Sequence, residues 1–191
     1  MESRLPGFAG EFLWELDIAR MQLLALATSI PAERYAWSPA GGTRALAAVL
    51  VHIAAGNFLL LHMAGAPATD LYGNAAADGL AQIAGMIRKN LELERNLTGK
   101  AEVIDFLTRS FESVRQCFLN AAPADLDRAG SFFGEQTTVR RVYLRMLAHS
   151  HEHMGQTIAY SRMMGIPMPW PDPLKTFEGA ISDTPGPLAA P

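Results

Sequence analysis

Three of the five histidines in this chain of 191 residues lie close together, at positions 149, 151 and 153. The surrounding residues have helical apolar spacing, and a helix turns by about 100° per residue, so His149 and His153 share one face while His151 lies on the other side. The shared face continues at alternating spacings of four and three through Val142, Met146, Gln156, Tyr160 and Met163. This spacing is typical of a face turned toward the interior of a helical bundle.

A second stripe on the same segment is also apolar, so periodicity alone leaves the choice of inner face open. Its members are Leu144, Leu147, His151, Met154 and Ile158. We expect the first stripe to face inward, because burying several polar groups without partners is costly and one shared metal ion would compensate them together.

Another histidine, His52, lies on the inner stripe of a second predicted helix. That stripe reads Ala45, Val49, His52, Gly56, Leu59 and Met63. Gly56, one turn after His52, leaves open space beside the imidazole where leucine would fill it. Three neutral imidazoles on two facing helices supply three ligands of a tetrahedral zinc or nickel site and leave the fourth position to water or substrate. The sequence therefore predicts a divalent metal site at His52, His149 and His153. The alternative is that one or all of them are core histidines hydrogen-bonded to backbone carbonyls.

Other polar residues near these positions have less specific interpretations. Gln156 and Tyr160 continue the inner stripe, where they either orient a metal ligand, bind substrate or close a polar network. His62 lies about 80° off the face of His52, and His151 points away from the pair, so both are expected at a surface or an interface. Glu152 is expected to be a solvated charge. No residue stands out as a general base, so catalytic residues are left unassigned.

Four long helices are predicted to position these side chains, and they cover about 8–29, 43–64, 98–123 and 137–164. Thr43, Thr98 and either Thr137 or Thr138 are the expected N-caps of the last three helices. Core-facing stripes support the first and third helices: Phe12, Leu16, Ala19, Leu23, Leu26 and Ile30 in one, and Ile104, Leu107, Phe111, Val114 and Phe118 in the other.

The predicted connections differ in character. Residues 31–42 form an ordered loop that carries Tyr35 and Trp37. Residues 66–99 contain loops and a short helix interrupted by Gly85, as in a crossover or a functional lid. Residues 123–136 read as a loop without convincing strands. Four long helices without strands predict an all-α four-helix bundle.

The C-terminal residues 167–191 hold seven of the twelve prolines and are expected to be extended or partly disordered. Trp170 and Phe177 could anchor the first half of this tail on the bundle. We therefore predict a bundle domain over 1–166 and a proline-rich tail over 167–191.

Composition excludes several classes of protein. The formal charge of −3 and the pI near 5.9 provide no basic surface for nucleic acid. The single cysteine, Cys117, excludes an intramolecular disulfide framework and is expected in core packing. The N-terminus lacks the apolar core of a signal peptide. The longest apolar run, 45–63, is interrupted by His52, Asn57 and His62, so we expect no membrane span and a cytoplasmic protein.

Two motifs resemble the DinB-like superfamily. The first is Tyr35-Ala-Trp-Ser-Pro-Ala-Gly-Gly-Thr-Arg44 followed by Leu50-Val-His-Ile-Ala-Ala55, and the second is His149-x-x-x-His153-Met-Gly-Gln156 with Tyr160-x-Arg162-x-x-Gly165. The similarity extends over about 8–167. It implies an up-down-down-up four-helix bundle with a long crossover between helices two and three, and a divalent metal held by three histidines that match His52, His149 and His153.

The resemblance also implies an activity. Members with assigned chemistry are thiol-dependent S-transferases that use bacillithiol, mycothiol or a similar small thiol, with glutathione in some maleylpyruvate isomerases, and homodimers are frequent. A metal-dependent thiol S-transferase acting on small electrophiles is therefore the first expectation. A non-catalytic, stress-related metal-binding bundle or ligand carrier is the alternative, and a metal-dependent hydrolase is less favoured. The tail from Met168 and the segment 71–85 match no family pattern, so the resemblance implies no substrate specificity.

Overall fold

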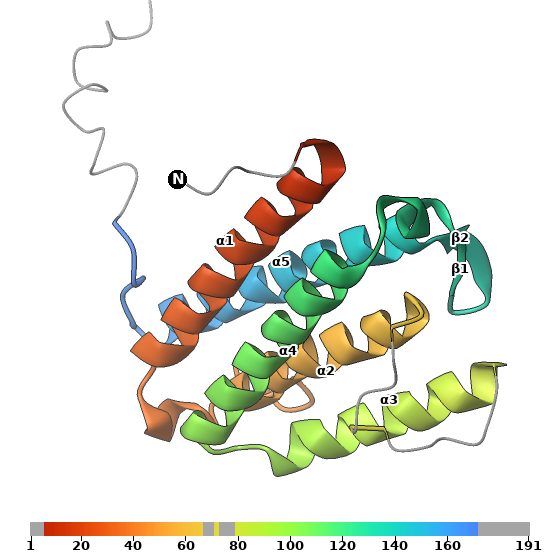
Figure 1. The fold of residues 1–191 in the computed structure, drawn as a ribbon. Coiled ribbons are helices and arrows are strands. Elements are labelled where there is room, and N and C mark those ends of the chain that lie inside the picture. The colour runs from red at the N-terminus through yellow and green to blue at the C-terminus, as the bar shows by residue number, and fades with distance from the viewer. Residues whose placement is uncertain (1–5, 67–70, 73–78, 172–191) are drawn as a thin grey trace, which may run out of the picture.

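The computed structural model describes residues 6–66, 71–72 and 79–171. Within them, four long helices form a bundle (Figure 1): α1 (Gly7–Ser29), α2 (Leu46–Met63), α4 (Lys100–Asn120) and α5 (Val139–Met163). Helices α1 and α5 run in one direction and α2 and α4 in the other, which confirms the up-down-down-up path. A fifth helix, α3 (Gly79–Asn96), lies in the long crossover between α2 and α4.

Helix α2 is the centre of the fold because α3, α4 and α5 each contact it. A helix covered on several sides can be apolar all round, and 78% of the segment Leu46–Met63 is buried inside the protein. We expected His52, Asn57 and His62 to make this segment too polar to pass as a membrane span. That expectation was wrong, since the mean hydropathy of the segment is 1.9, which is in the range of membrane-spanning helices. Because most of the segment is buried, its apolar composition is that of a core helix.

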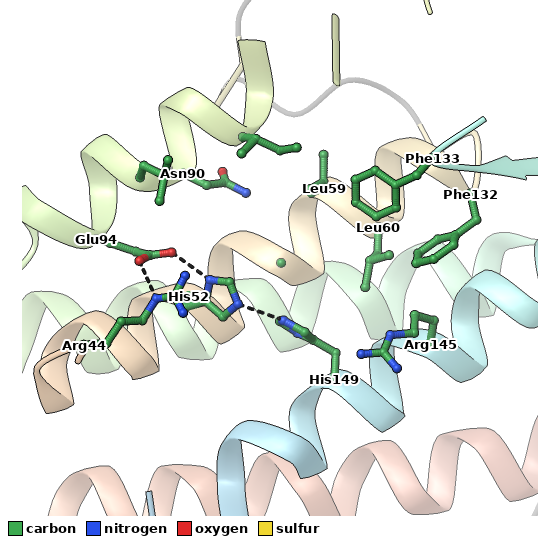
Figure 2. A pocket seen from close by; sticks show the side chains of 13 residues that line it. Arg44, His52, Leu59, Leu60, Asn90, Glu94, Phe132, Phe133, Arg145 and His149 are labelled. Carbon is green, nitrogen blue, oxygen red and sulfur yellow. Dashed lines mark hydrogen bonds and ion pairs between the residues drawn. The ribbon is translucent and has the colours of Figure 1, made fainter. Parts of the chain in front are cut away.

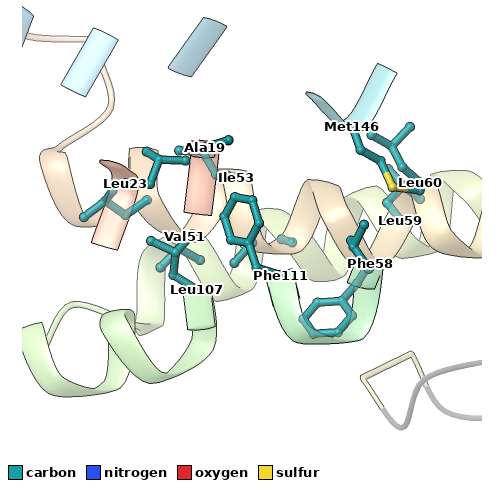
Figure 3. Packing of buried hydrophobic residues seen from close by; sticks show 14 of the residues in the cluster. Ala19, Leu23, Val51, Ile53, Phe58, Leu59, Leu60, Leu107, Phe111 and Met146 are labelled. Atoms are coloured by element: carbon teal, nitrogen blue, oxygen red, sulfur yellow. The ribbon is translucent and has the colours of Figure 1, made fainter. Parts of the chain in front are cut away.

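The core forms where the predicted stripes meet (Figure 3). The six residues of the first predicted stripe, five in α1 and its C-cap Ile30, are all buried. Leu107 and Phe111 of α4 face Val51 and Ile53 of α2. Each such fully buried side chain stabilises the fold by about 1.5–3 kcal/mol relative to exposure. On α5 the first stripe faces inward as expected from Val142 to Tyr160, whereas Met163 is 63% exposed.

The loop 31–45 caps α2 with its backbone, so the predicted cap at Thr43 was wrong. The N–H groups of Leu46 and Ala47 donate to the carbonyl oxygens of Trp37 and Tyr35, each at 2.9 Å. The Thr43 hydroxyl instead donates to the carbonyl of Ala40 at 2.6 Å. The loop folds back far enough to satisfy the first donors of the helix, so no capping side chain is needed.

The other two predicted caps had opposite outcomes. The N-cap of α4 is Gly99, which has no capping side chain, so the cap at Thr98 was wrong. The N-cap of α5 is Thr138, whose hydroxyl accepts a hydrogen bond from the N–H of Arg141 at 3.3 Å. This cap confirms the second of the two threonines proposed for that position.

Helix α3 is 18 residues long and is not interrupted at Gly85, so the predicted interruption was wrong. Its buried residues, Met86, Asn90 and Glu94, are four apart and therefore lie on one face. Packing of that face against α2 outweighs the cost of about 1 kcal/mol for a glycine inside a helix.

A β-hairpin occupies part of the segment expected to lack strands. After a 3-10 turn at Pro123–Asp127, β1 (Ala129–Phe132) pairs antiparallel with β2 (Glu135–Thr138). The two residues between the strands, Phe133 and Gly134, both have positive φ, at 51° and 90°. A type I′ turn needs this conformation and usually has Asn-Gly, so Phe-Gly does not read as a hairpin in the sequence.

The tail is described only as far as residue 171. Trp170 is partly buried and packs against the core, as expected, while Phe177 lies outside the described residues. The division into 1–166 and 167–191 stays a prediction.

Cys117 is partly buried against the core, as expected, and its burial raises the pKa of the thiol.

Candidate metal centre

The three predicted ligands meet between two helices. His52 comes from α2 and His149 and His153 from α5, and one ligand nitrogen of each lies within 4.8 Å of the other two. The Nε2 atoms of His52 and His149 are 3.2 Å apart. The two remaining histidines lie elsewhere: Nε2 of His62 is 3.1 Å from Oε1 of Gln82, and His151 is exposed.

Gly56 is the reason α2 and α5 approach closely at this point. A Cβ atom at position 56 would lie 2.4 Å from Cε1 of His149, closer than any real contact. The space beside His52 that the sequence predicted is therefore filled by the ring of His149. A side chain at position 56 would therefore force that ring to shift.

Glu94 of α3 holds the outer nitrogen of His52 (Figure 2). Its Oε1 is 2.7 Å from Nδ1 of His52, and its Oε2 accepts from Nε of Arg44 at 2.7 Å. Burial of this carboxylate, which is 8% exposed, raises its pKa, but hydrogen bonds from His52 and Arg44 and their charges bring the pKa below its ordinary value. An ionised carboxylate accepts only, so His52 donates through Nδ1 and keeps its lone pair on Nε2.

Sequence reasoning missed Glu94 and Arg44. The recurrence of Met86, Asn90 and Glu94 at intervals of four could have identified the buried face of α3. Apolar periodicity does not reveal this face, because two of its three residues are polar. Arg44 lies in a loop, where no periodicity applies.

His153 has an equivalent partner from its own helix. Its Nδ1 is 2.9 Å from Oε1 of Gln156, whose Nε2 donates to the Tyr160 hydroxyl at 2.9 Å. That hydroxyl donates to the carbonyl of Arg44 at 3.3 Å, and the ring of Trp37 packs edge-on against Tyr160. Gln156 and Tyr160 thus form one polar chain that ends on His153 and orients it.

His149 is the histidine with least support from the protein. Its Nδ1 is buried and has no hydrogen-bond partner among the described residues. Burial, and then the charges of His52 and His153, lower its pKa to about 3. Burial likewise lowers the pKa of His153, opposed by the Gln156 hydrogen bond. At neutral pH both imidazoles are therefore neutral, which is the form that binds a metal.

These residues fit a divalent metal ion. Two nitrogens about 2.0–2.1 Å from one tetrahedral zinc ion lie about 3.3 Å apart, close to the 3.2 Å between the Nε2 atoms of His52 and His149. Metal-bound histidines usually donate their other N–H to a carboxylate, carbonyl or water, as His52 and His153 do here. The alternative of core histidines satisfied by backbone carbonyls is less consistent with these two side-chain partners.

A cavity of about 310 Å³ opens onto this cluster (Figure 2). Its polar lining consists of Arg44, His52, Asn90, Glu94, Arg145 and His149. Its apolar lining consists of Leu59, Leu60, Ile87, Leu91, Phe132 and Phe133, and Gly56 also lines it. A mostly apolar cavity with a few convergent polar groups is typical of small-molecule sites.

Arg145, which lines the cavity, forms a bidentate ion pair with Glu152 of the same helix. One pair of atoms is 3.0 Å apart, and the carboxylate is exposed. The hydrogen bond from Arg145 is the main cause that lowers the pKa of Glu152. Glu152 is thus a solvated charge, as expected.

Comparison with known proteins identifies the family and the fold. The model of the DinB superfamily matches residues 15–157. Among curated proteins, none matches the sequence. Among solved structures, the chain is similar to a DinB-like protein from Bacillus cereus, with a TM-score of 0.60 and 17% identity over 86% of this chain and 97% of the other. At that identity the likeness shows the fold alone.

Proposed function

The chain belongs to the DinB superfamily, and from that membership and the histidine geometry we propose that it is a metal-dependent S-transferase that joins a small thiol to a small electrophile. The observation that supports this most is the convergence of His52, His149 and His153 beside a cavity. Two of these rings are oriented by outer partners, as expected of ligands that must hold a fixed geometry.

A bound zinc or nickel ion would favour the thiolate form of the thiol and hold its sulfur at the ligand position that the histidines leave open. Arg44 and Arg145 line the cavity near the histidines, where each forms an ion pair with a glutamate. In the transfer, the thiol loses its proton and its sulfur forms a bond to the electrophilic carbon. In a substitution the leaving group departs with its electron pair, and in an addition the π electrons move to the other atom of the double bond, which takes up a proton.

Metal content and thiol consumption test this proposal together. We expect about one zinc or nickel ion per wild-type chain by inductively coupled plasma mass spectrometry, and loss of the metal in His52→Ala, His149→Ala and His153→Ala. We expect the wild type, but not His153→Ala, to consume thiol with a chlorobimane electrophile. His151→Ala is the matched control, because that imidazole is exposed on the other side of α5. Equal rates in wild type and His153→Ala would refute the proposal.

A non-catalytic ligand carrier is the second candidate, and the apolar lining of the cavity favours it. It predicts that removing metal lowers the melting temperature while no combination of thiol and electrophile turns over. A metal-dependent hydrolase has less support. Both oxygens of Glu94, the carboxylate that lines the cavity, are already paired with His52 and Arg44, which leaves it poorly placed to act as a general base.

A further inference from the structure

We propose that the cleft between α3 and the tip of the β1–β2 hairpin binds the uncharged, apolar body of a ligand whose polar or reactive end lies at His52 and His149. This inference rests on the proposed function and specifies it, because it names the class of electrophile. The cleft is the apolar end of the 310 Å³ cavity, and the histidines lie at its polar end (Figure 2).

Three elements that are distant in sequence supply the apolar walls. Leu59 and Leu60 of α2 lie beside the Phe132 and Phe133 rings of the hairpin (Figure 2). The third wall is α3, through Ile87 and Leu91. These last two are 36% and 37% exposed, while α3 uses Met86, Asn90 and Glu94 for its buried face. Helix α3 therefore presents a second apolar edge to the cleft that its packing on α2 does not require.

Phe133 is the most informative residue of the cleft. Its φ of 51° is the one positive φ of a non-glycine residue in the described chain, and its side chain is 45% exposed. Asparagine or glycine would adopt this turn at lower cost, and an exposed ring adds little to the core. Backbone strain that core packing does not explain is a reason to look for a function, and here the ring lines the cavity.

The charges around the cavity favour an uncharged ligand body. Arg44 is paired with Glu94, and Arg145 with Glu152. A charged group in the cleft would have to compete with one of these pairs or lie against the leucine and phenylalanine side chains without a partner. An apolar group gains from burial there and leaves both ion pairs intact.

Titration with N-phenyl-1-naphthylamine, a neutral fluorescent probe, tests the cleft directly in metal-free protein. We expect saturable binding of one probe per chain. Phe133→Gly removes the ring and also relieves the positive φ, so the fold is kept while affinity drops about tenfold. Met21→Ala is the control, since it removes an exposed apolar side chain from α1 and should leave binding unchanged. No binding, or equal binding in wild type and Phe133→Gly, would overturn the inference.

Displacement of the probe by 1-hexanol, 1-octanol and 1-decanol tests whether the cleft prefers an apolar ligand body. Each added methylene should tighten binding about fourfold until the cavity is full. Affinity that stays constant from 1-hexanol to 1-decanol would show that the cleft takes up no apolar body and would refute the inference. Because these assays need neither metal nor turnover, probe binding without thiol transfer counts against the proposed function alone. Thiol transfer that Phe133→Gly leaves unchanged with an apolar electrophile counts against the cleft alone.

Discussion

The three histidines of the cluster differ in the hydrogen-bond partner of their Nδ1 atom. His52 has the Glu94 carboxylate, His153 has the Gln156 amide, and His149 has no partner in the described chain. A carboxylate partner increases the basicity of a metal-bound imidazole more than an amide does, because its charge stabilises the polarised ring. Glu94 is therefore the partner whose loss should weaken metal binding most.

The change Glu94→Gln tests this role. We expect metal affinity to fall about 10- to 100-fold, because the amide accepts a weaker hydrogen bond from His52. The measurement is competition with a chelator, together with the visible spectrum of the cobalt-substituted protein, which reports ligand geometry. Glu92→Gln is the control, as this side chain on the same helix is 55% exposed. Unchanged affinity and spectrum in Glu94→Gln would remove the positioning role of Glu94.

Acid should destabilise the metal-free protein through His149. The pKa of this imidazole is about 3 in the folded chain and near 6.5 when unfolded. Between these values the unfolded chain binds a proton that the folded chain does not, so stability falls as the pH falls below 6.5. One such group contributes up to about 1.4 kcal/mol per pH unit, and the lowered pKa of His153 acts in the same direction.

Urea unfolding between pH 7 and pH 5 with chelator present measures this dependence. We expect His149→Asn to have a flatter dependence than the wild type. His151→Asn, which removes an exposed imidazole from the same helix, should retain the wild-type slope. Equal slopes in His149→Asn and the wild type would contradict the assignment.

At the scale of elements, the site depends on the approach of α2 to α5 and on the cover that α3 provides. The approach is possible because Gly56 has no side chain, and the cover brings Glu94 to His52. The up-down-down-up path makes α2 and α5 antiparallel neighbours, while the long crossover leaves room for α3. Sequence-distant residues thus meet at one point through helix packing.

Gly56→Ala should separate the two helices at the cluster. The new Cβ would meet Cε1 of His149 at 2.4 Å, so the ring must move, and we expect a loss of about 1–3 kcal/mol in unfolding free energy together with weaker metal binding. Gly155→Ala is the matched control inside α5, where nothing lies within 4 Å of the added Cβ. There alanine should raise stability by up to about 1 kcal/mol. A Gly56→Ala protein as stable as wild type, with full metal affinity, would contradict this account of the approach.

At the scale of the whole molecule, a metal ion would join helices that are far apart in the chain. His52 and His149 are 97 residues apart, and the unfolded chain does not hold them together. A ligand that binds only the folded state stabilises that state by mass action.

We also propose that the protein is a homodimer, which sedimentation of the full chain at several concentrations would test.

Zinc should therefore raise the melting temperature. At a free concentration 100 times Kd, the gain is about 2.7 kcal/mol, or roughly 5–10 °C for a domain of this size. Differential scanning calorimetry with zinc and with chelator measures the shift. His153→Ala should show no shift and His151→Ala a full one. A wild-type melting temperature that is the same with zinc and with chelator would count against metal binding by the folded state.

The sequence by itself determined the four bundle helices and the three histidines that meet. Both follow from local periodicity: an inner stripe needs only the spacing of side chains along one helix, so Phe12 to Ile30 and the pair His149 and His153 could be assigned without knowing what lies opposite. The glycine at position 56 was also visible, although not the ring that fills its space. Of the predicted caps, only the one at Thr137 or Thr138 was confirmed, at Thr138.

The tertiary structure alone decided which groups surround the histidines. Glu94 and Arg44 reach His52 from a crossover helix and a loop, and their placement depends on packing against α2 rather than on spacing in the chain. The loop 31–45 replaced the cap expected at Thr43 for the same reason. Phe133 lines the cavity through a turn that its residue type does not favour. Local sequence preferences carry no information on such contacts, because the partner lies on another element whose position only the folded chain defines.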